Sequence, residues 1–216
     1  MGGALRRWLV VVGLLGGALA SSASPAEAHP HVWITATSEL IYAPDGALSS
    51  VRHAWTFDDM YSSFAVQGLE STTKGVFSRE ELAPLAQTNA EALKEFHFFT
   101  YATADGKKQT FEDPVDYYLE FKDSLLTLTF TLPLRAKVPS KQLLLEIFDP
   151  EFFINFTFAD TDPVRLVGAP AACQIKFQRP NDGTVNAQQL GEQNFQNGDN
   201  SNFGAMYANK IMVDCP

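Results

Sequence analysis

The fold of this chain is decided by two segments, Val32-Trp-Ile-Thr-Ala-Thr-Ser-Glu-Leu-Ile-Tyr42 and Leu48-Ser-Ser-Val-Arg-His-Ala-Trp-Thr-Phe57. Apolar residues recur at every second position in both segments, which is the period of a half-buried β-strand. The turn signal Pro44-Asp45-Gly46 lies between them. The two segments therefore predict an antiparallel hairpin.

A helical insertion is expected after this hairpin, at about residues 59–96. Asp58 to Gln67 suits a short helix, and Ser78-Arg79-Glu80-Glu81 has the residue types of a capping box. A longer helix should follow from about Arg79 to Phe96. Pro84 falls near its first turn, where proline bends a helix without ending it.

The two-residue period returns after the insertion. Strands are expected at residues 98–104, 115–122, 125–132, 142–148, 152–159, 165–167, 173–178 and 210–215. About ten short strands separated by turn signals indicate a mainly β (α+β) fold, either an antiparallel β-sandwich or a flattened barrel, carrying the inserted helix-loop-helix. Residues 180–204, rich in Asn, Gln and Gly, are expected to form a long surface excursion.

Residues 1–28 have the layout of a secretory signal peptide. Arg6-Arg7 precede an apolar stretch at residues 8–20, and Ala26-Glu27-Ala28 forms a small-x-small cleavage box. The apolar stretch is too short to span a bilayer, which needs about 20 residues. We expect cleavage after Ala28, export to the periplasm and no stable membrane insertion afterwards. An uncleaved signal anchor is the alternative.

The remaining residues, 29–216, are expected to form a single β-rich domain. The whole chain has a formal net charge of −9; because the leader holds two arginines and one glutamate, the mature chain carries −10. Such an acidic chain offers no basic footprint for nucleic acid. Cys173 and Cys215 are its two cysteines, and two cysteines in an exported chain most often form a disulfide.

The stretch from Glu70 to Glu81 fits the twelve-residue frame of an EF-hand, with Gly75 at the sixth position and Glu81 at the twelfth. Calcium also needs oxygen ligands at the first, third and fifth positions. Lys74 occupies the fifth, which puts a cation where a ligand is required. We therefore expect a degenerate EF-hand-like loop without calcium; a chance helical hairpin with a glycine turn fits the pattern equally well.

The histidines offer the main candidate chemistry. Cleavage after Ala28 would make His29 the first residue, so that its α-amine and imidazole lie two residues from His31. Imidazoles at this spacing suit zinc, nickel or copper. Pro30 lacks an amide proton, so a square-planar site built from successive backbone amides is excluded. Exposed terminal histidines without a ligand are the alternative.

A third metal donor has to come from elsewhere in the chain. His53 is the first candidate because the two opening strands should pair. It shares a parity with apolar residues, however, which favours a core histidine over a ligand. Asp149 is the second. Further carboxylates at expected strand ends are Asp58, Asp59 and Glu151. His97 falls where a helix meets a strand and is interpreted as structural or exposed.

Enzyme signatures are missing from the sequence. It contains no G-x-S-x-G, no G-x-x-x-x-G-K-[ST], no H-E-x-x-H and no G-x-G-x-x-G. The paired acids Asp58-Asp59 would need a cleft before they indicated glycosidase chemistry. We therefore do not expect an enzyme.

Several motifs together resemble one bacterial periplasmic family of unknown function, usually labelled the periplasmic component of an uncharacterised ABC-type transport system. They are His29-Pro30-His31-Val32-Trp33-Ile34, Arg52-His53-Ala54-Trp55-Thr56-Phe57-Asp58, Ser62-Ser63-Phe64, Ser78-Arg79-Glu80-Glu81-Leu82, Glu112-Asp113-Pro114-Val115-Asp116-Tyr117 and Phe148-Asp149-Pro150-Glu151-Phe152-Phe153. The resemblance covers nearly the whole mature chain. It implies export, a small β-rich domain and a link to transition-metal permeases.

The leading hypothesis is thus a periplasmic accessory protein that binds or presents a divalent transition metal (Zn, Ni, Co or Cu) for inner-membrane transporter components. His29 and His31 would be its primary ligands, and His53 or Asp149 would complete the site. Two alternatives stay open. One is a structural or interaction module of a transport system that binds no metal, and the other is a copper oxidoreductase that uses the terminal histidine.

Overall fold

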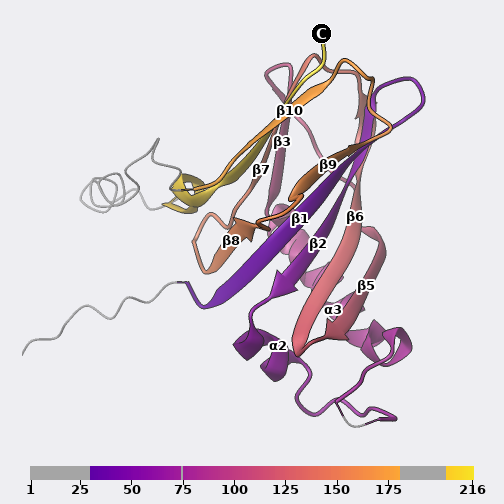
Figure 1. The fold of residues 1–216 in the computed structure, drawn as a ribbon, viewed down its shortest axis with the longest axis vertical. Helices are drawn as coiled ribbons and strands as arrows, with labels where there is room; N and C mark the ends of the chain where they lie inside the picture. Colours follow the sequence, from indigo (N-terminus) through magenta and orange to yellow (C-terminus); the bar gives the residue numbers. More distant parts are fainter. Residues whose placement is uncertain (1–29, 74, 181–202) are drawn as a thin grey trace, which may run out of the picture.

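The computed structural model describes residues 30–73, 75–180 and 203–216. Its elements, in chain order, are β1 (Val32–Tyr42), β2 (Leu48–Phe57), α2 (Asp59–Ala65), α3 (Arg79–Glu95), η1 (His97–Phe99), β3 (Thr100–Ala104), β4 (Lys107–Lys108), β5 (Val115–Lys122), β6 (Leu125–Val138), β7 (Gln142–Ile147), β8 (Ile154–Phe158), β9 (Val164–Val167), β10 (Gln174–Gln178), η2 (Phe203–Tyr207) and β11 (Asn209–Asp214) (Figure 1).

The predicted hairpin is confirmed, with both strands at the expected bounds. β1 and β2 pair antiparallel from Ile34↔Phe57 to Tyr42↔Leu48, and Gly46 takes the positive φ of 81° that the tight turn requires. One face of each strand is buried, as the alternation of the sequence demands. This face supplies the centre of the core, where the Trp55 ring lies 4.8 Å from that of Phe130.

The strands form two sheets that do not close into a barrel, so the sandwich is the correct form of the prediction. The larger sheet has the order β5-β6-β2-β1-β8, with β9 also paired to β1; the smaller has the order β10-β11-β7-β3-β4. One feature differs from an all-antiparallel sandwich, because β8 and β9 run parallel to β1. That pairing brings the chain's first strand beside the turn that follows β7.

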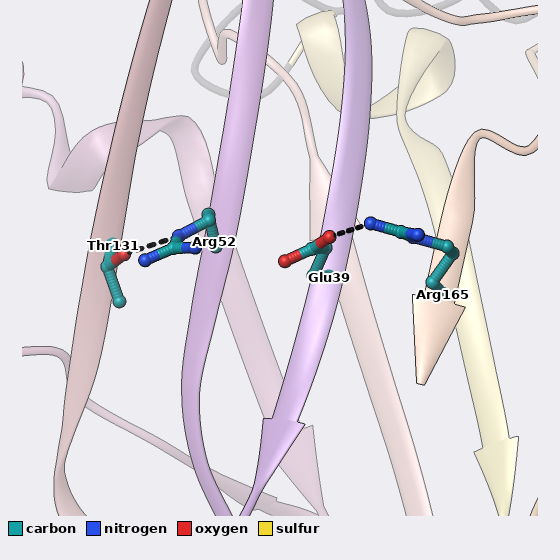
Figure 2. Close-up of polar contacts among 4 residues, drawn as sticks. All are labelled: Glu39, Arg52, Thr131 and Arg165. Carbon is teal, nitrogen blue, oxygen red and sulfur yellow. Dashed lines mark hydrogen bonds and ion pairs between the residues drawn. The ribbon is translucent and has the colours of Figure 1, made fainter. Parts of the chain in front are cut away.

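A polar row crosses the larger sheet on its other face (Figure 2). Glu39 and Arg52 are direct cross-strand neighbours. Arg165 of β9 forms an ion pair with Glu39, and Arg52 donates to the Thr131 hydroxyl at 3.0 Å. Polar residues therefore alternate with the buried apolar ones, as expected for an antiparallel sheet that covers a core with one face only.

The predicted helices are also confirmed. Asp58 caps α2 by accepting from the Tyr61 N–H, and Ser78 with Glu81 completes the expected capping box at the start of α3. α3 continues through Pro84 to Glu95 and packs against β5, with Leu82, Ala86 and Ala90 buried. None of the helices in the described ranges is both long and apolar enough to cross a bilayer.

Cys173 and Cys215 form the expected disulfide. It joins the residue before β10 to the residue after β11, so it fastens two neighbouring strands at one end of the smaller sheet. A disulfide is compatible with an exported protein, because disulfides persist in oxidising compartments.

Candidate functional site

The start of β1 lies directly beside the β7–β8 turn. The backbone N–H of His31 donates to the Phe153 carbonyl at 2.8 Å, and the His31 imidazole centre lies 4.7 Å from the Phe153 ring centre. Val32 then pairs with Ile154 in parallel register. The exposed His31 side chain is thereby held against this turn rather than on a loose tail. His29 lies outside the described residues.

Asp149 organises the turn from within. Its Oδ1 accepts from the Glu151 N–H at 3.0 Å and its Oδ2 from the Ile154 N–H at 3.0 Å. The residue is only 5% exposed, so the carboxylate satisfies two backbone donors that would otherwise lack partners. Glu151, by contrast, is exposed. Of the two carboxylates, Glu151 is the one free of backbone donors in the described structure.

The turn is braced by η2, near the carboxyl terminus. The Phe152 ring stacks on Tyr207 with centres 3.8 Å apart, and the Gly204 N–H donates to the Pro150 carbonyl at 2.8 Å. Phe152 has a φ of 56°, in the left-handed region that non-glycine residues rarely adopt. Segments distant in sequence thus fix the position of residues 149–153.

A groove of about 390 Å³ runs between this turn and the end of α3. Its lining residues are Asn89, Ala92, Leu93, Phe96, Phe99, Asp149, Glu151, Phe153 and Ile154. Phe96 and Phe153 remain about half exposed, at 49% and 46%. The groove is therefore largely apolar, with the two carboxylates on one wall and His31 packed on its Phe153 rim.

His53 lies in the core, away from the groove lining. Its side chain is 0% exposed; its Nδ1 lies 2.9 Å from the Ser38 hydroxyl and its Nε2 lies 3.2 Å from the Thr100 hydroxyl. Thr100 in turn donates to the Phe98 carbonyl at 2.8 Å. These contacts link the larger sheet to the smaller one through a single imidazole.

The direction of this hydrogen-bond chain assigns the His53 tautomer. Thr100 has one hydroxyl proton and gives it to the Phe98 carbonyl, so its oxygen accepts from His53 Nε2–H. Nδ1 is then the acceptor for the Ser38 hydroxyl. Burial lowers the pKa of His53 from 6.5 to about 3, since desolvation disfavours the charged ring. The geometry favours the core role for His53 over metal ligation.

The other predicted donors do not converge on His31. Asp58 accepts from the Tyr61 and Trp33 N–H groups, each at 2.8 Å, and Asp59 lies in the first turn of α2. His97 is exposed, as expected. Within residues 30–73, 75–180 and 203–216, no three His, Cys, Asp or Glu side chains are placed to hold one metal ion. A metal site of three such side chains that uses His31 would therefore need at least one residue outside these ranges, such as His29.

The EF-hand-like loop is tied by internal hydrogen bonds. The Glu81 carboxylate accepts from the Thr72 N–H at 2.7 Å, from the Thr72 hydroxyl at 2.9 Å and from the Ser78 N–H at 2.7 Å. These donors hold the pKa of Glu81 at about 2, below its ordinary 4.5. The carboxylate at the twelfth position, which ligates calcium in an EF-hand, here accepts hydrogen bonds from residues of its own loop.

Glu81→Gln is expected to destabilise the protein at pH 7 and to lose that effect on acidification. Because the pKa of Glu81 is lower in the folded than in the unfolded chain, its contribution is complete above pH 4.5 and declines as the pH falls toward 2. Urea unfolding of wild type and variant at pH 7, 4.5 and 3.5 measures the difference. Glu80→Gln removes a charge from the same helix turn as a control; an equal pH trend in both variants would contradict the assignment.

Two features escaped the sequence reasoning. The three residues His97, Phe98 and Phe99 are left-handed, with φ of 51°, 54° and 47°, and none is a Gly or Asn that would have signalled this. The sequence analysis did not predict the η2 brace, Phe203–Tyr207; the surface excursion expected at residues 180–204 lies almost entirely outside the described residues. The aromatic spacing of Phe203 and Tyr207 was the available signal.

Together these features define a two-sheet β-sandwich with a helix-loop-helix insertion and a groove where its first strand meets the β7–β8 turn. The chain belongs to the family described as "Protein of unknown function (DUF1007)", whose model matches residues 14–215. The expected membership of a family of unknown function is thus confirmed.

Two relatives with similar sequences are themselves uncharacterised proteins. An uncharacterised protein of Haemophilus influenzae is 24% identical over 193 residues, which are 87% of this chain and 91% of the relative. An uncharacterised 15.5 kDa protein in the trpE 3' region of Spirochaeta aurantia is 28% identical over 93 residues, 43% of this chain and 66% of the relative.

Proposed function

We propose that this chain is an exported, periplasmic accessory protein that binds a divalent transition metal at its mature amino terminus and presents it to an inner-membrane transporter. The observation that supports this most directly is the pairing of His31 with Phe153. It holds His31 against the turn that carries Asp149 and Glu151, whereas His53 is buried in the core.

The donor set we propose is the His29 α-amine and imidazole, the His31 imidazole and the Glu151 carboxylate. Glu151 replaces Asp149 as the third residue because both Asp149 oxygens already accept backbone N–H groups. Nitrogen donors with one carboxylate suit Zn²⁺, Ni²⁺, Co²⁺ or Cu²⁺. The exposed position of His31 and Glu151 is the arrangement needed to pass an ion to a partner rather than to retain it.

Calorimetric titration of protein with a native His29 terminus, using Zn²⁺, Ni²⁺, Co²⁺ and Cu²⁺ in turn, tests the proposal. We expect one ion per chain. His31→Ala should weaken binding by at least about tenfold, since losing a ligand costs no less than losing a second-shell partner. Glu151→Gln should weaken binding less than His31→Ala, because two imidazoles and the amine remain.

His97→Ala is the matched control, because His97 is also an exposed histidine but lies outside the groove lining. It should bind metal as tightly as wild type. Equal affinity in wild type and His31→Ala, or an equal loss in His97→Ala, would reject the site. The alternative of an interaction module without metal would then be the better description.

A further inference from the structure

A second cavity, of about 660 Å³, lies beside the short strand β4. Among the described residues, β4 (Lys107–Lys108) pairs with Thr103 and Ala104 of β3. After Lys108 the chain crosses to the larger sheet, where Phe111 bridges to Leu134. The cavity, called here the β3-edge cavity, is lined by residues of η1, β3, β4, this crossing segment, β6, β7 and the β7–β8 turn. Its volume falls within the range of small-molecule sites, about 300–1,000 Å³.

Aromatic rings supply much of the lining of the β3-edge cavity. They belong to Phe98, Tyr101, Phe111 and Phe148. The Tyr101 and Phe148 ring centres are 4.6 Å apart. Burial, with a smaller effect of the Asp149 carboxylate, raises the pKa of Tyr101, so its phenol stays protonated at neutral pH. Apolar walls with a few placed polar groups are typical of ligand pockets.

The charges on the lining leave one cation uncompensated. Arg135 forms an ion pair with Glu112 at 3.1 Å, and Glu146 forms one with Lys210 at 3.3 Å. Lys108 also lines the cavity, and it has no ion-pair partner among the residues that the structure describes. A free ammonium group beside aromatic walls is notable in a chain whose net charge is −9.

One wall of the cavity is backbone in a rare conformation. His97 and Phe98 both line it, and both are left-handed. This conformation is unfavourable for residues other than glycine, and the Thr100 hydroxyl bond to the Phe98 carbonyl helps to hold the segment in place. Backbone strain of this kind persists where surrounding structure enforces it and clusters at ligand sites.

We propose that the β3-edge cavity binds a small organic anion with an aromatic or other flat apolar body. The anionic group would pair with Lys108, and the body would lie against Tyr101 and Phe148. The volume, the aromatic walls and the uncompensated cation each favour this class of ligand. The site is separate from the groove beside His31 and does not depend on metal binding.

The test uses two fluorescent probes with the same ring system. The aromatic sulfonate 8-anilinonaphthalene-1-sulfonate should bind wild-type protein at one site with increased emission. Lys108→Gln should weaken that binding by about tenfold, the usual effect of losing one hydrogen bond to a charged group. N-phenyl-1-naphthylamine, which lacks the sulfonate, should bind wild type and Lys108→Gln equally.

Two further variants fix the location. Lys107→Gln removes the same charge from the neighbouring residue of β4, which does not line the cavity, and should leave both affinities unchanged. Thr103→Phe should fill the cavity and weaken both probes. Equal sulfonate affinity in Lys108→Gln and wild type, an equal loss in Lys107→Gln, or unchanged binding of both probes by Thr103→Phe would overturn the proposal.

Discussion

Acidification from pH 6.5 to pH 4.5 is expected to lower the free energy of unfolding by roughly 2 kcal/mol through His53 alone. The pKa of His53 is about 3 in the folded chain, whereas an imidazole in the unfolded chain has its ordinary pKa of 6.5. The unfolded chain therefore takes up a proton that the folded chain excludes. The contribution of His53 to the free energy of unfolding is complete above pH 6.5. It falls by about 1.4 kcal/mol for each pH unit between pH 6.5 and pH 3.

His53→Gln separates this effect from general acid sensitivity. A glutamine amide has both the acceptor for Ser38 and the donor for Thr100, but it does not titrate. We expect a lower stability at pH 7 from imperfect replacement of the ring, and a nearly flat profile between pH 6.5 and pH 4.5. Urea unfolding at half-unit pH intervals measures both slopes.

His97→Gln is the control for that measurement, because it makes the same substitution at an exposed histidine. It should keep the wild-type slope. A wild-type slope in His53→Gln would show that His53 is not the group responsible. It would also remove the support for a neutral imidazole between the two sheets.

The sequence predicted the parts of this structure that depend on local periodicity and capping. β1 and β2 alternate over most of their length, and the Ser78 and Glu81 side chains identify the start of α3, so these elements appear at the expected residues. The parity of His53 with Trp55 correctly indicated a core position as one of two roles. Each of these inferences needs only neighbours within a few residues.

The site required information that local patterns do not carry. The parallel pairing of β1 with β8 joins residues more than a hundred positions apart, and His31 lies against Phe153 at the start of that pairing. The hydrogen bonds of Asp149 to the turn were not predicted for a related reason, because a carboxylate that could bind a metal and one that caps a turn look the same in sequence. The positive φ values at residues 97–99 and at Phe152 likewise fall on residue types that do not signal a left-handed backbone.

The position of the β7–β8 turn also depends on a close contact with Gly204 of η2, which lies far from the turn in the sequence. Gly204 lies so near the turn that an added Cβ would stand 1.6 Å from the Asp149 carbonyl oxygen and 2.7 Å from its carbon. Both atoms are backbone, so no side-chain rotation can relieve the overlap. Either η2 or the turn has to move.

Gly204→Ala is accordingly expected to lower the free energy of unfolding by about 3 kcal/mol, the upper part of the usual range for overpacking. Urea unfolding at pH 7 measures the loss. Gly75→Ala is the control, because Gly75 has a φ of 76° but nothing within 4 Å of an added Cβ, which limits its cost to about 1 kcal/mol.

The same substitution tests whether the turn and the amino terminus form one site. If His31 and Glu151 act together, displacing residues 149–153 should weaken metal binding in Gly204→Ala at a temperature where the variant is still folded, while Gly75→Ala binds as wild type does. A variant that is destabilised yet binds metal with full affinity would mean that the terminal histidines act without the turn. The clash would then affect the stability of the protein but not its metal site, and Glu151 would have to be removed from the proposed donor set.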